Sequence, residues 1–301
     1  MDPAINIVGG YYEGIEKVNF ADVCSFGVEG STCMSDDFKK KLKSTKIPNY
    51  KKEDVERITA AGRNEDELNL LLAASSVIPE DEIINEYKRF SAVGPTDTSL
   101  FNNFVEDQVL SRINNYIPSF YHVPVQLMDF SHPTHTFNTK LRELVQDIGP
   151  EIGKKYKTFG CILNTLRSTG SLSKVGHWVA MFGDFRRKDY YSIEYFNSSG
   201  RDAEPDAFKW MEKTAKEIQK LTGKKTIAVN VSNIKHQKSN TECGAYSAYF
   251  IIYRQFGGEY KDFRAEPISD ELMTKFRSKI LISEKKITPE NLQFLKSRRL
   301  V

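Results

Sequence analysis

A single cysteine stands where a polar stretch of the sequence gives way to an apolar one. The residues from Lys235 to Glu242 are polar, Cys243 and Gly244 follow, and an apolar and aromatic run then extends to Tyr253. This pattern predicts a loop that delivers Cys243 to the first turn of a buried helix. Unsatisfied N–H groups and the positive end of the helix dipole at that position favour the thiolate, which is the nucleophilic form of cysteine.

A nucleophilic cysteine needs a base, and two upstream segments supply one. Residues 176–182 and 190–197 have the alternating pattern of half-buried strands, and a polar turn at 184–189 separates them. If the two strands form a hairpin about this turn, His177 lies directly opposite Asn197, with the two Cβ atoms about 5 Å apart. We expect Asn197 to accept a hydrogen bond from Nδ1–H of the imidazole, which leaves Nε2 free to take the thiol proton.

Two amides precede the cysteine closely enough to act on the same substrate atom. Gln237 lies six residues before Cys243 and can donate an N–H to a developing oxyanion, and Asn240, three residues before it, could share that role. A single His, Asn or Gln is more often a surface residue, or one that only makes structural hydrogen bonds, than a catalytic one. The combination of His177, Asn197, Gln237 and Cys243 in this order is far more specific than any member.

The order His, Asn, Gln, Cys resembles the Ulp1/adenain-like cysteine proteases. The resemblance includes His-Trp and Cys-Gly pairs at the base and the nucleophile, and it covers roughly residues 94–280. The segments 158–165, 176–180 and 192–198 carry it most clearly. These segments place the intervening strands, as well as the catalytic candidates, within the resemblance.

The resemblance implies a cysteine endopeptidase. As the resemblance implies, Cys243 would attack the scissile carbonyl, and His177 would act first as general base and then as general acid. Asn197 orients the imidazole, although the wider family often has Asp there, and a neutral amide stabilises an imidazolium less. Gln237 and the backbone N–H of Cys243 stabilise the oxyanion.

The resemblance also implies the substrate. It points to cleavage after Gly-Gly in viral structural polyproteins during capsid and core maturation, in the viral factory of the host cytoplasm and in the virion. A narrow tunnel that excludes side chains would select two glycines, because any Cβ would clash. Trp178, next to His177, is the candidate roof of that tunnel, or else an ordinary core residue. Asn240 is the second candidate substrate-binding residue.

Other classes of function remain open at this stage. A deconjugating enzyme resembling a deubiquitinase or deSUMOylase would also act on chains that end in Gly-Gly. A non-catalytic scaffold could dock Gly-Gly tails, and an acyltransferase could use the same triad. A panel of Gly-Gly peptides and ubiquitin-like conjugates would separate these alternatives.

Charge balance and cysteine content limit the kinds of partner and cofactor that we expect for this chain. The 301 residues carry 43 basic and 40 acidic side chains, interleaved along the chain, for a net charge of +3. That balance does not indicate a nucleic-acid partner. The four cysteines are too few and too irregularly spaced for a disulfide framework or a zinc site, so we expect reduced thiols, no metal and no cofactor. No secretory signal or membrane-spanning run is apparent, and we expect a monomer.

The element pattern predicts an α+β fold, with a central mixed β-sheet flanked by helices and an N-terminal helical arm domain. The segment Gly94-Pro95-Thr96 predicts a linker. The predicted domains are therefore a helical arm domain at 1–94 and a protease core domain at 95–301. Helices are predicted at 54–76, 79–90, 99–117, 205–222 and 270–281, and further strands at 123–130, 159–165 and 226–231. The basic tail after Lys285 is predicted to be exposed.

Overall fold

The computed structural model describes residues 33–133, 135, 138–169, 176–231 and 233–301. These residues form two compact units, which we describe separately. The sheet unit comprises the described residues of 117–276. The helical unit comprises 33–116 and 277–301.

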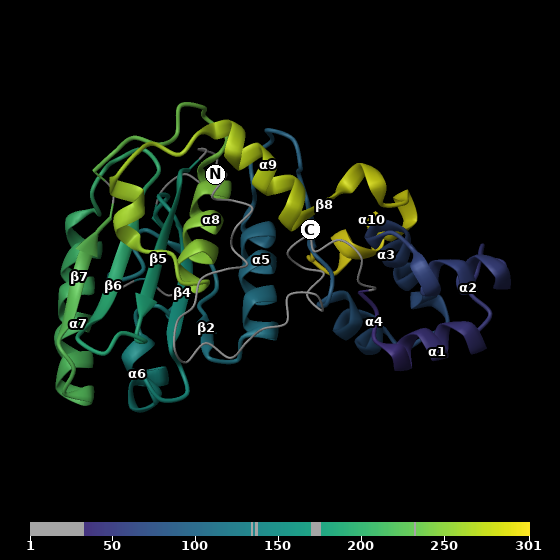
Figure 1. Cartoon of the computed structure of the whole chain (residues 1–301), viewed down its shortest axis with the longest axis horizontal. Helices are drawn as coiled ribbons and strands as arrows, with labels where there is room; N and C mark the ends of the chain where they lie inside the picture. The colour runs from purple at the N-terminus through teal and green to yellow at the C-terminus, as the bar shows by residue number, and fades with distance from the viewer. Residues whose placement is uncertain (1–32, 134, 136–137, 170–175, 232) are drawn as a thin grey trace. The chain divides into compact units, whose positions relative to one another are not determined.

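A mixed sheet in the order β2-β4-β5-β6-β7, with β3 also paired with β4, forms the centre of the sheet unit (Figure 1). β2 and β3 run parallel to β4, the β4–β5 and β5–β6 pairs are antiparallel, and β7 is parallel to β6. The strands are β2 (Phe120–His122), β3 (Gln126–Leu127), β4 (Thr158–Asn164), β5 (Trp178–Asp184), β6 (Tyr191–Phe196) and β7 (Thr226–Asn230). The helices are α6 (Leu144–Ile148), α7 (Pro205–Thr222), α8 (Cys243–Gln255), the short 3-10 turns η4 (Gly149–Glu151) and η5 (Tyr260–Arg264), and the start of α9 (Asp270–Ile280).

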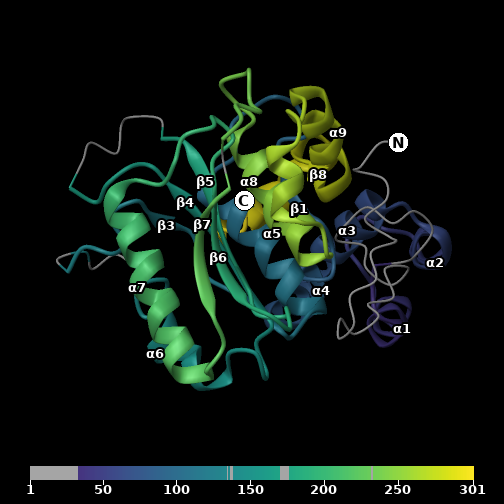
Figure 2. The ribbon, with the colours of Figure 1, turned by 60° about the vertical axis from the view of Figure 1, so that its left-hand side comes forward.

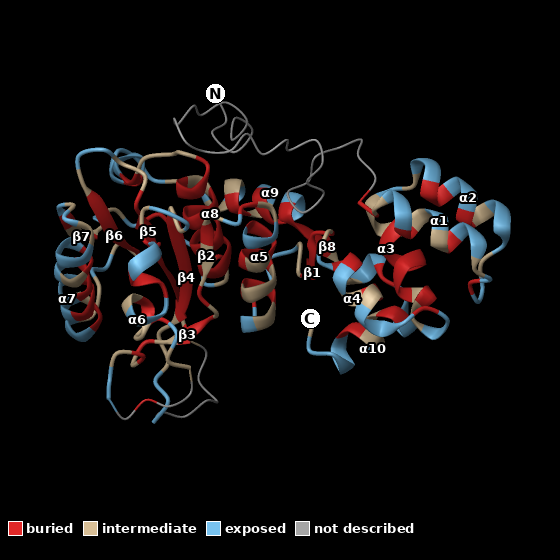
Figure 3. Cartoon of the chain, turned by 90° about the horizontal axis from the view of Figure 1, so that it is seen from below, coloured by how far each residue is buried: buried red, intermediate tan, exposed pale blue. Residues whose placement is uncertain are grey.

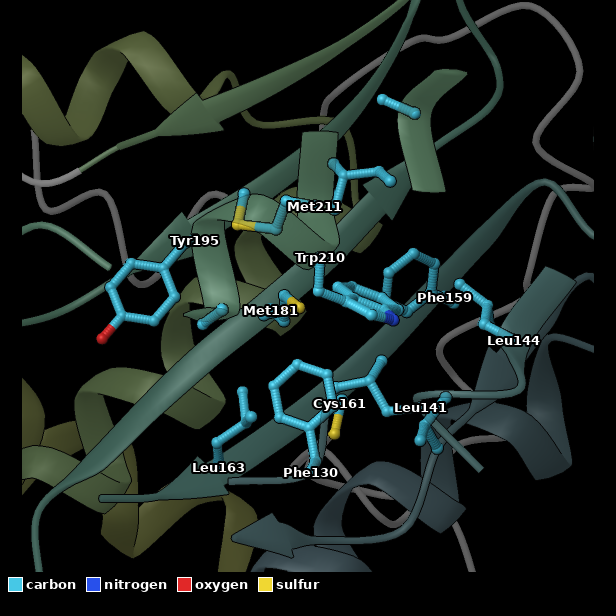
Figure 4. Close-up of a cluster of buried hydrophobic side chains, with 14 of the residues drawn as sticks. Phe130, Leu141, Leu144, Phe159, Cys161, Leu163, Met181, Tyr195, Trp210 and Met211 are labelled. Carbon is cyan, nitrogen blue, oxygen red and sulfur yellow. The ribbon is translucent and has the colours of Figure 1, made fainter. Parts of the chain in front are cut away.

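Both faces of this sheet are covered by helices, with α7 on one side and α8 on the other (Figure 2). Alternate residues of the strands, among them Cys161 and Met181, join a buried cluster with Trp210 of α7 (Figure 4). The residues between them face α8, where Phe196 stacks on Phe250 with ring centroids 4.7 Å apart. The predicted α+β fold with a central mixed sheet is therefore confirmed, and Cys161 is a core residue as expected.

Only part of the predicted strand at 123–130 forms. Within that range only β3, Gln126–Leu127, is a strand, because β2 ends before it at His122 and residues 128–131 are in turns. Pro124 lies between the two strands and has no backbone N–H to donate to β4, so the ladder is interrupted there. Apolar alternation alone did not reveal this interruption.

The helical unit has a hydrophobic core of its own, visible as the buried faces of its helices in Figure 3. Two short strands, β1 and β8, pair in parallel within it. Its elements are α1 (Asp36–Ser44), α2 (Lys52–Ala61), α3 (Asn64–Ala73), η3 (Ala74–Ser76), α4 (Glu80–Tyr87), β1 (Ala92–Gly94), α5 (Asn103–Tyr116), the end of α9, β8 (Leu281–Ser283), η6 (Glu284–Lys286) and α10 (Pro289–Ser297).

The C-terminal tail is part of this core, so the prediction of an exposed tail is wrong. Ile287 and Leu295 are buried with residues of α1 to α4. Thr288 caps α10 by accepting a hydrogen bond from the N–H of Asn291, and Pro289 occupies the first turn, where its missing N–H costs nothing. The apolar residues of the tail are too few to show helical periodicity among its many charges.

The two units also divide the chain differently from the predicted boundary at 94/95. Residues 95–116 and 277–301 both group with the helical unit. The pairing of β8 with β1 and the hydrogen bonds from Arg277 to the carbonyls of Asp97 and Ser99 hold these segments together. Such contacts between distant segments leave no mark on local composition.

Two further findings concern the membrane and cysteine predictions. Among the described residues, no helix is both long and apolar enough to cross a membrane. Cys33 is in a disulfide bond, so the expectation of uniformly reduced cysteines is wrong at that position, and Cys161 and Cys243 are buried thiols. Cys24 lies outside the described residues.

Candidate active site

Helix α8 begins at Cys243, as the change from polar to apolar sequence predicted. The thiol is almost completely buried, and Glu242 occupies the N-cap position. Arg254, near the other end of α8, forms ion pairs with Asp184 at the end of β5. At the start of α8, the ring of Tyr246 lies against the ring of His236, with centroids 6.3 Å apart, and the N–H of His236 donates to the carbonyl of Ser198. The first turn of α8 therefore lies near the turn that follows β6.

His177 and Asn197 form a hydrogen-bonded pair beside this helix end. The imidazole Nε2 lies 2.8 Å from Oδ1 of Asn197. The same Oδ1 accepts hydrogen bonds from the backbone N–H of Ser199 at 3.0 Å and from its hydroxyl at 2.8 Å. A backbone N–H can only donate, so the shared atom is the amide oxygen, and Nε2 must carry the proton that it donates.

The predicted partnership is therefore present, but two of its details are wrong. Asn197 holds Nε2 and not Nδ1, so Nδ1 is the ring nitrogen that keeps a lone pair for a thiol proton. The β5–β6 register, which pairs Ala180 with Phe196, sets Asn197 level with Val179 and not with His177. A slip of two residues keeps every side chain on the same face, so the alternating pattern could not detect it.

A tight turn after β6 sets the position of Asn197. Its side chain bonds the N–H of Ser199, and its carbonyl accepts from the N–H of Gly200 at 2.9 Å. Gly200 has φ +77°, and a Cβ there would come within 2.8 Å of the backbone nitrogen of Lys235. The sequence Asn-Ser-Ser-Gly is a known turn signal, so this support for the dyad was available from the sequence.

Burial and charge both hold the imidazole in its neutral form. Burial lowers the pKa of His177 below its ordinary value, and the positive charge of Arg201 lowers it further, while the hydrogen bond to Asn197 acts in the opposite direction. Thr165 brackets the backbone of His177: its hydroxyl accepts from the His177 N–H, and its own N–H donates to the His177 carbonyl. A neutral base in a fixed orientation is suited to take a proton from a neighbouring thiol.

Gln237 is buried beside the same turn. Its side-chain Oε1 accepts from the hydroxyl of Ser198 at 2.8 Å, and its Nε2 donates to the carbonyl of Ser239 at 2.9 Å. Its backbone N–H donates to the carbonyl of Ser198 at 3.0 Å. An amide nitrogen carries two hydrogens, so one N–H is used to hold the side chain and the second is available to another acceptor.

The two predicted substrate-binding residues differ in their surroundings. Trp178 is the first residue of β5 and is 7% exposed. Asn240 is an exposed residue of the loop before α8. The structure thus brings His177, Asn197 and Gln237 together around the Ser198 turn, with Cys243 at the adjoining helix end, while Asn240 lies at the surface.

Ser198, Ser199 and Thr165 are the residues at this site that sequence reasoning did not single out. They contact the dyad and Gln237 through backbone groups and hydroxyls. Short hydroxyl residues are common in loops, and only the turn signal around Ser199 distinguished any of them in advance.

Proteins of known class are similar to this chain in sequence. The chain is 40% identical over 199 residues to the SUMO-1 cysteine protease of African swine fever virus, an alignment that covers 63% of this chain and 71% of the relative. A protein of a second strain of that virus, named cysteine protease, aligns with the same identity and coverage. No family model matches the chain.

Solved structures agree with the sequence comparison. A crystal structure of the African swine fever virus protease matches with a TM-score of 0.65 at 27% identity, over 87% of this chain and 96% of that one. A selenomethionine form matches with a TM-score of 0.67 at 26% identity, over 92% and 98%. The chain belongs to the cysteine protease family that includes this viral enzyme, and the predicted enzyme class is confirmed.

Proposed function

We propose that the chain is an endopeptidase that cleaves viral structural polyproteins after Gly-Gly, with Cys243 as nucleophile and His177 as base. The observation that carries the proposal is the hydrogen bond from His177 Nε2–H to Asn197, next to a helix that begins at a buried cysteine. Membership of the cysteine protease family supports the assignment.

The proposed reaction follows from the tautomer. Nδ1 of His177 takes the thiol proton as Cys243 attacks the scissile carbonyl, and then gives it to the leaving amine. Asn197 keeps Nε2 protonated and the ring oriented throughout. The remaining Nε2–H of Gln237 and the backbone N–H of Cys243 donate to the oxyanion, and water then hydrolyses the thioester.

Selection of two glycines would come from a restricted channel. Trp178 adjoins the base and has little exposed surface, so a roof over the scissile bond is compatible with its position. In this proposal a Cβ at either glycine would collide with the channel and lower the rate. The proposed setting is the viral factory of the host cytoplasm and the virion, during capsid and core maturation.

A second function has one specific observation in its favour. The name of the viral relative includes SUMO-1, and ubiquitin-like proteins end in Gly-Gly. A deconjugating enzyme would use the same chemistry on an isopeptide bond. The difference lies in whether recognition extends beyond the terminal glycines to a folded partner.

One experiment separates the two functions. Purified enzyme is incubated with peptides that contain Gly-Gly-Xaa, Ala-Gly-Xaa or Gly-Ala-Xaa, and with SUMO and ubiquitin conjugates, with Cys243→Ala as the blank. Rapid cleavage of Gly-Gly-Xaa peptides alone supports the endopeptidase. Conjugates cleaved much faster than any peptide would establish the deconjugating enzyme instead, and equal rates on Ala-Gly and Gly-Gly would contradict the channel.

A further inference from the structure

The residue proposed to stabilise the oxyanion lies on a segment without regular secondary structure. Residues 233–242 connect β7 to α8, and Gln237 is near their middle. A donor must be held within a few tenths of an ångström of its working position, because a misplacement of about 1 Å can cost about 10²-fold in rate. The segment therefore needs anchors on both sides, and Ser198 supplies only the first.

The second anchor is the carboxylate of Asp270. Its Oδ2 accepts hydrogen bonds from the backbone N–H groups of Lys238, at 3.1 Å, and Ser239, at 2.8 Å. These are the two residues that follow Gln237. The carbonyl of Ser239 in turn accepts from Nε2 of Gln237. Asp270 therefore holds the N–H of the same residue, Ser239, whose carbonyl holds the Gln237 side chain.

The same carboxylate also ties the segment to the nucleophile's helix. Oδ1 of Asp270 accepts from the hydroxyl of Tyr246 at 3.0 Å. Tyr246 is three residues after Cys243 in the first turn of α8 and is completely buried. Asp270 thus links the segment that carries Gln237 to the helix turn that carries Cys243.

Neighbouring contacts reinforce this link. The N–H of Ile268 donates to Nδ1 of His236 at 3.0 Å. The carbonyl of Ile268 lies 2.8 Å from the Tyr246 hydroxyl, which shares its single proton between this carbonyl and Oδ1 of Asp270. His236 is buried directly before Gln237 in the chain. Residues 268–270 therefore hold the segment from both the His236 and the Ser239 sides.

Capping of α9 does not account for these contacts. Ser269 performs that role, since its hydroxyl accepts from the N–H of Leu272 at 3.2 Å. Glu271 is also acidic and also lies in the first turn, yet its carboxylate pairs with Lys275 on the exposed side of the helix. Of these two neighbouring carboxylates, Asp270 is the one that the structure joins to the loop before α8.

We propose that Asp270 is a positioning residue that holds Gln237 in register with the first turn of α8, and so sets the geometry of the oxyanion site. The inference rests on the proposed role of Gln237. Asp270 accepts hydrogen bonds from the two residues after Gln237 and from Tyr246, so its effect on the reaction is indirect. Its removal should weaken transition-state stabilisation and leave the nucleophile itself intact.

The test compares Asp270→Ala, Asp270→Asn and the matched control Glu271→Ala in the full chain. Each variant is assayed for kcat and KM on a Gly-Gly-Xaa peptide, for the rate of Cys243 alkylation by iodoacetamide, and for thermal stability. We expect Asp270→Ala to lower kcat about 10–10²-fold, with KM and the alkylation rate nearly unchanged. Glu271→Ala should match the wild type.

The conservative variant provides a rescue. Asn at position 270 can present its oxygen to the two backbone N–H groups and its NH₂ to the Tyr246 oxygen, so Asp270→Asn should recover most of the lost kcat. Equal kcat for Asp270→Ala and Glu271→Ala would overturn the inference. So would an equal fall in the alkylation rate and kcat, because that result would assign Asp270 to the nucleophile or to general stability.

A double variant separates this inference from the proposed function. Gln237→Ala should lower kcat about 10²–10³-fold, and adding Asp270→Ala should then have little further effect. If Gln237→Ala lowers kcat and Asp270→Ala does not, only the positioning role fails. If Gln237→Ala keeps the wild-type kcat, the oxyanion assignment fails and the positioning role fails with it, while Cys243→Ala still tests proteolysis by itself.

Discussion

The two ends of α8 have opposite chemistry. At the N-terminal end lies Cys243, with the neutral His177–Asn197 pair beside it. At the C-terminal end, Arg254 is completely buried against two carboxylates, Asp184 and Glu194. One end is built from neutral hydrogen-bonding groups and the other from fully paired charges.

At the C-terminal end of α8, the charged side chains form hydrogen-bonded ion pairs with one another. Arg254 donates to both oxygens of Glu194 at 2.7 Å and to Asp184 at 2.9 Å. Arg186 donates to both oxygens of Asp184 and to the last carbonyls of α8, those of Arg254 and Gln255. Burial raises the pKa of Asp184, but Arg186 and Arg254 outweigh it and hold that pKa below its usual range.

The comparison teaches which end is built for stability and which for chemistry. Every charge at the C-terminal end has a partner, so the cluster holds α8 on the sheet and has little capacity left for a ligand. At the N-terminal end the imidazole keeps a nitrogen lone pair and Gln237 keeps one amide hydrogen beyond the bonds that position them. Changes at the two ends should therefore separate activity from stability.

The largest expected effect is at the nucleophile. Cys243→Ala should lower turnover by about 10⁵-fold or more while leaving the unfolding midpoint close to that of the wild type, because the change removes the nucleophile and only one heavy atom. Peptide cleavage and urea denaturation measure the two quantities. Cys161→Ala is the matched control, since it removes an equally buried thiol on the α7 side of the sheet and should keep its turnover.

The second effect is at the opposite end of α8. Arg254→Met should destabilise the protein by about 3–5 kcal/mol, because Glu194 would be left buried without its cation. The fraction that remains folded should keep its kcat. Urea denaturation measures the loss, and Lys275→Met, which breaks the exposed pair with Glu271, should leave the midpoint unchanged.

Two outcomes would break this comparison. A loss of kcat in folded Arg254→Met would show that the charged end acts on the chemistry. Failure of the compensating pair Arg254→Met with Glu194→Gln to recover part of the stability would show that charge pairing is not what the cluster supplies.

The third effect concerns orientation of the base. Asn197→Ala should lower kcat by about 10²–10³-fold, because the ring loses the acceptor that fixes its tautomer, while KM changes little. Steady-state kinetics on a Gly-Gly-Xaa peptide measures it. A variant with unchanged kcat/KM would show that the contacts of Thr165 with the His177 backbone are enough to hold the base without the amide.

The smallest effect is a shift of the pH profile. The pKa of His177 is lowered by burial and by Arg201, so activity should persist to pH values below the ordinary imidazole pKa and fall as His177 becomes protonated. Asn197→Asp adds a negative charge beside the ring, which raises that pKa and moves the acidic limb of kcat/KM upward by about one pH unit. Arg201→Ala should move it in the same direction by less, since Arg201 is exposed. A downward shift in either variant would contradict the assigned electrostatics.

Much of the site could be predicted because its signals are local. The start of α8 at Cys243 follows from the change in composition at that residue, and the strands before Asn197 and after His177 follow from alternation. The mixed sheet between two helical layers followed from the same patterns together with the family resemblance. These features depend only on the residues within one element or one turn, so they can be predicted from a short stretch of sequence.

The exact pairing within the site depended on the tertiary structure. A two-residue change in strand register leaves every side chain on its face, and either imidazole nitrogen can point at Asn197 after rotation of the ring, so neither choice has a sequence signature. The same limit applies to the grouping of residues 277–301 with the helical unit. It applies again to Asp270, which reaches Lys238 and Ser239 from 31 or 32 positions away in the chain. Contacts of this kind are selected by packing across the whole unit, because many distant carboxylates could satisfy the same backbone N–H groups and only the folded chain decides which one is within reach.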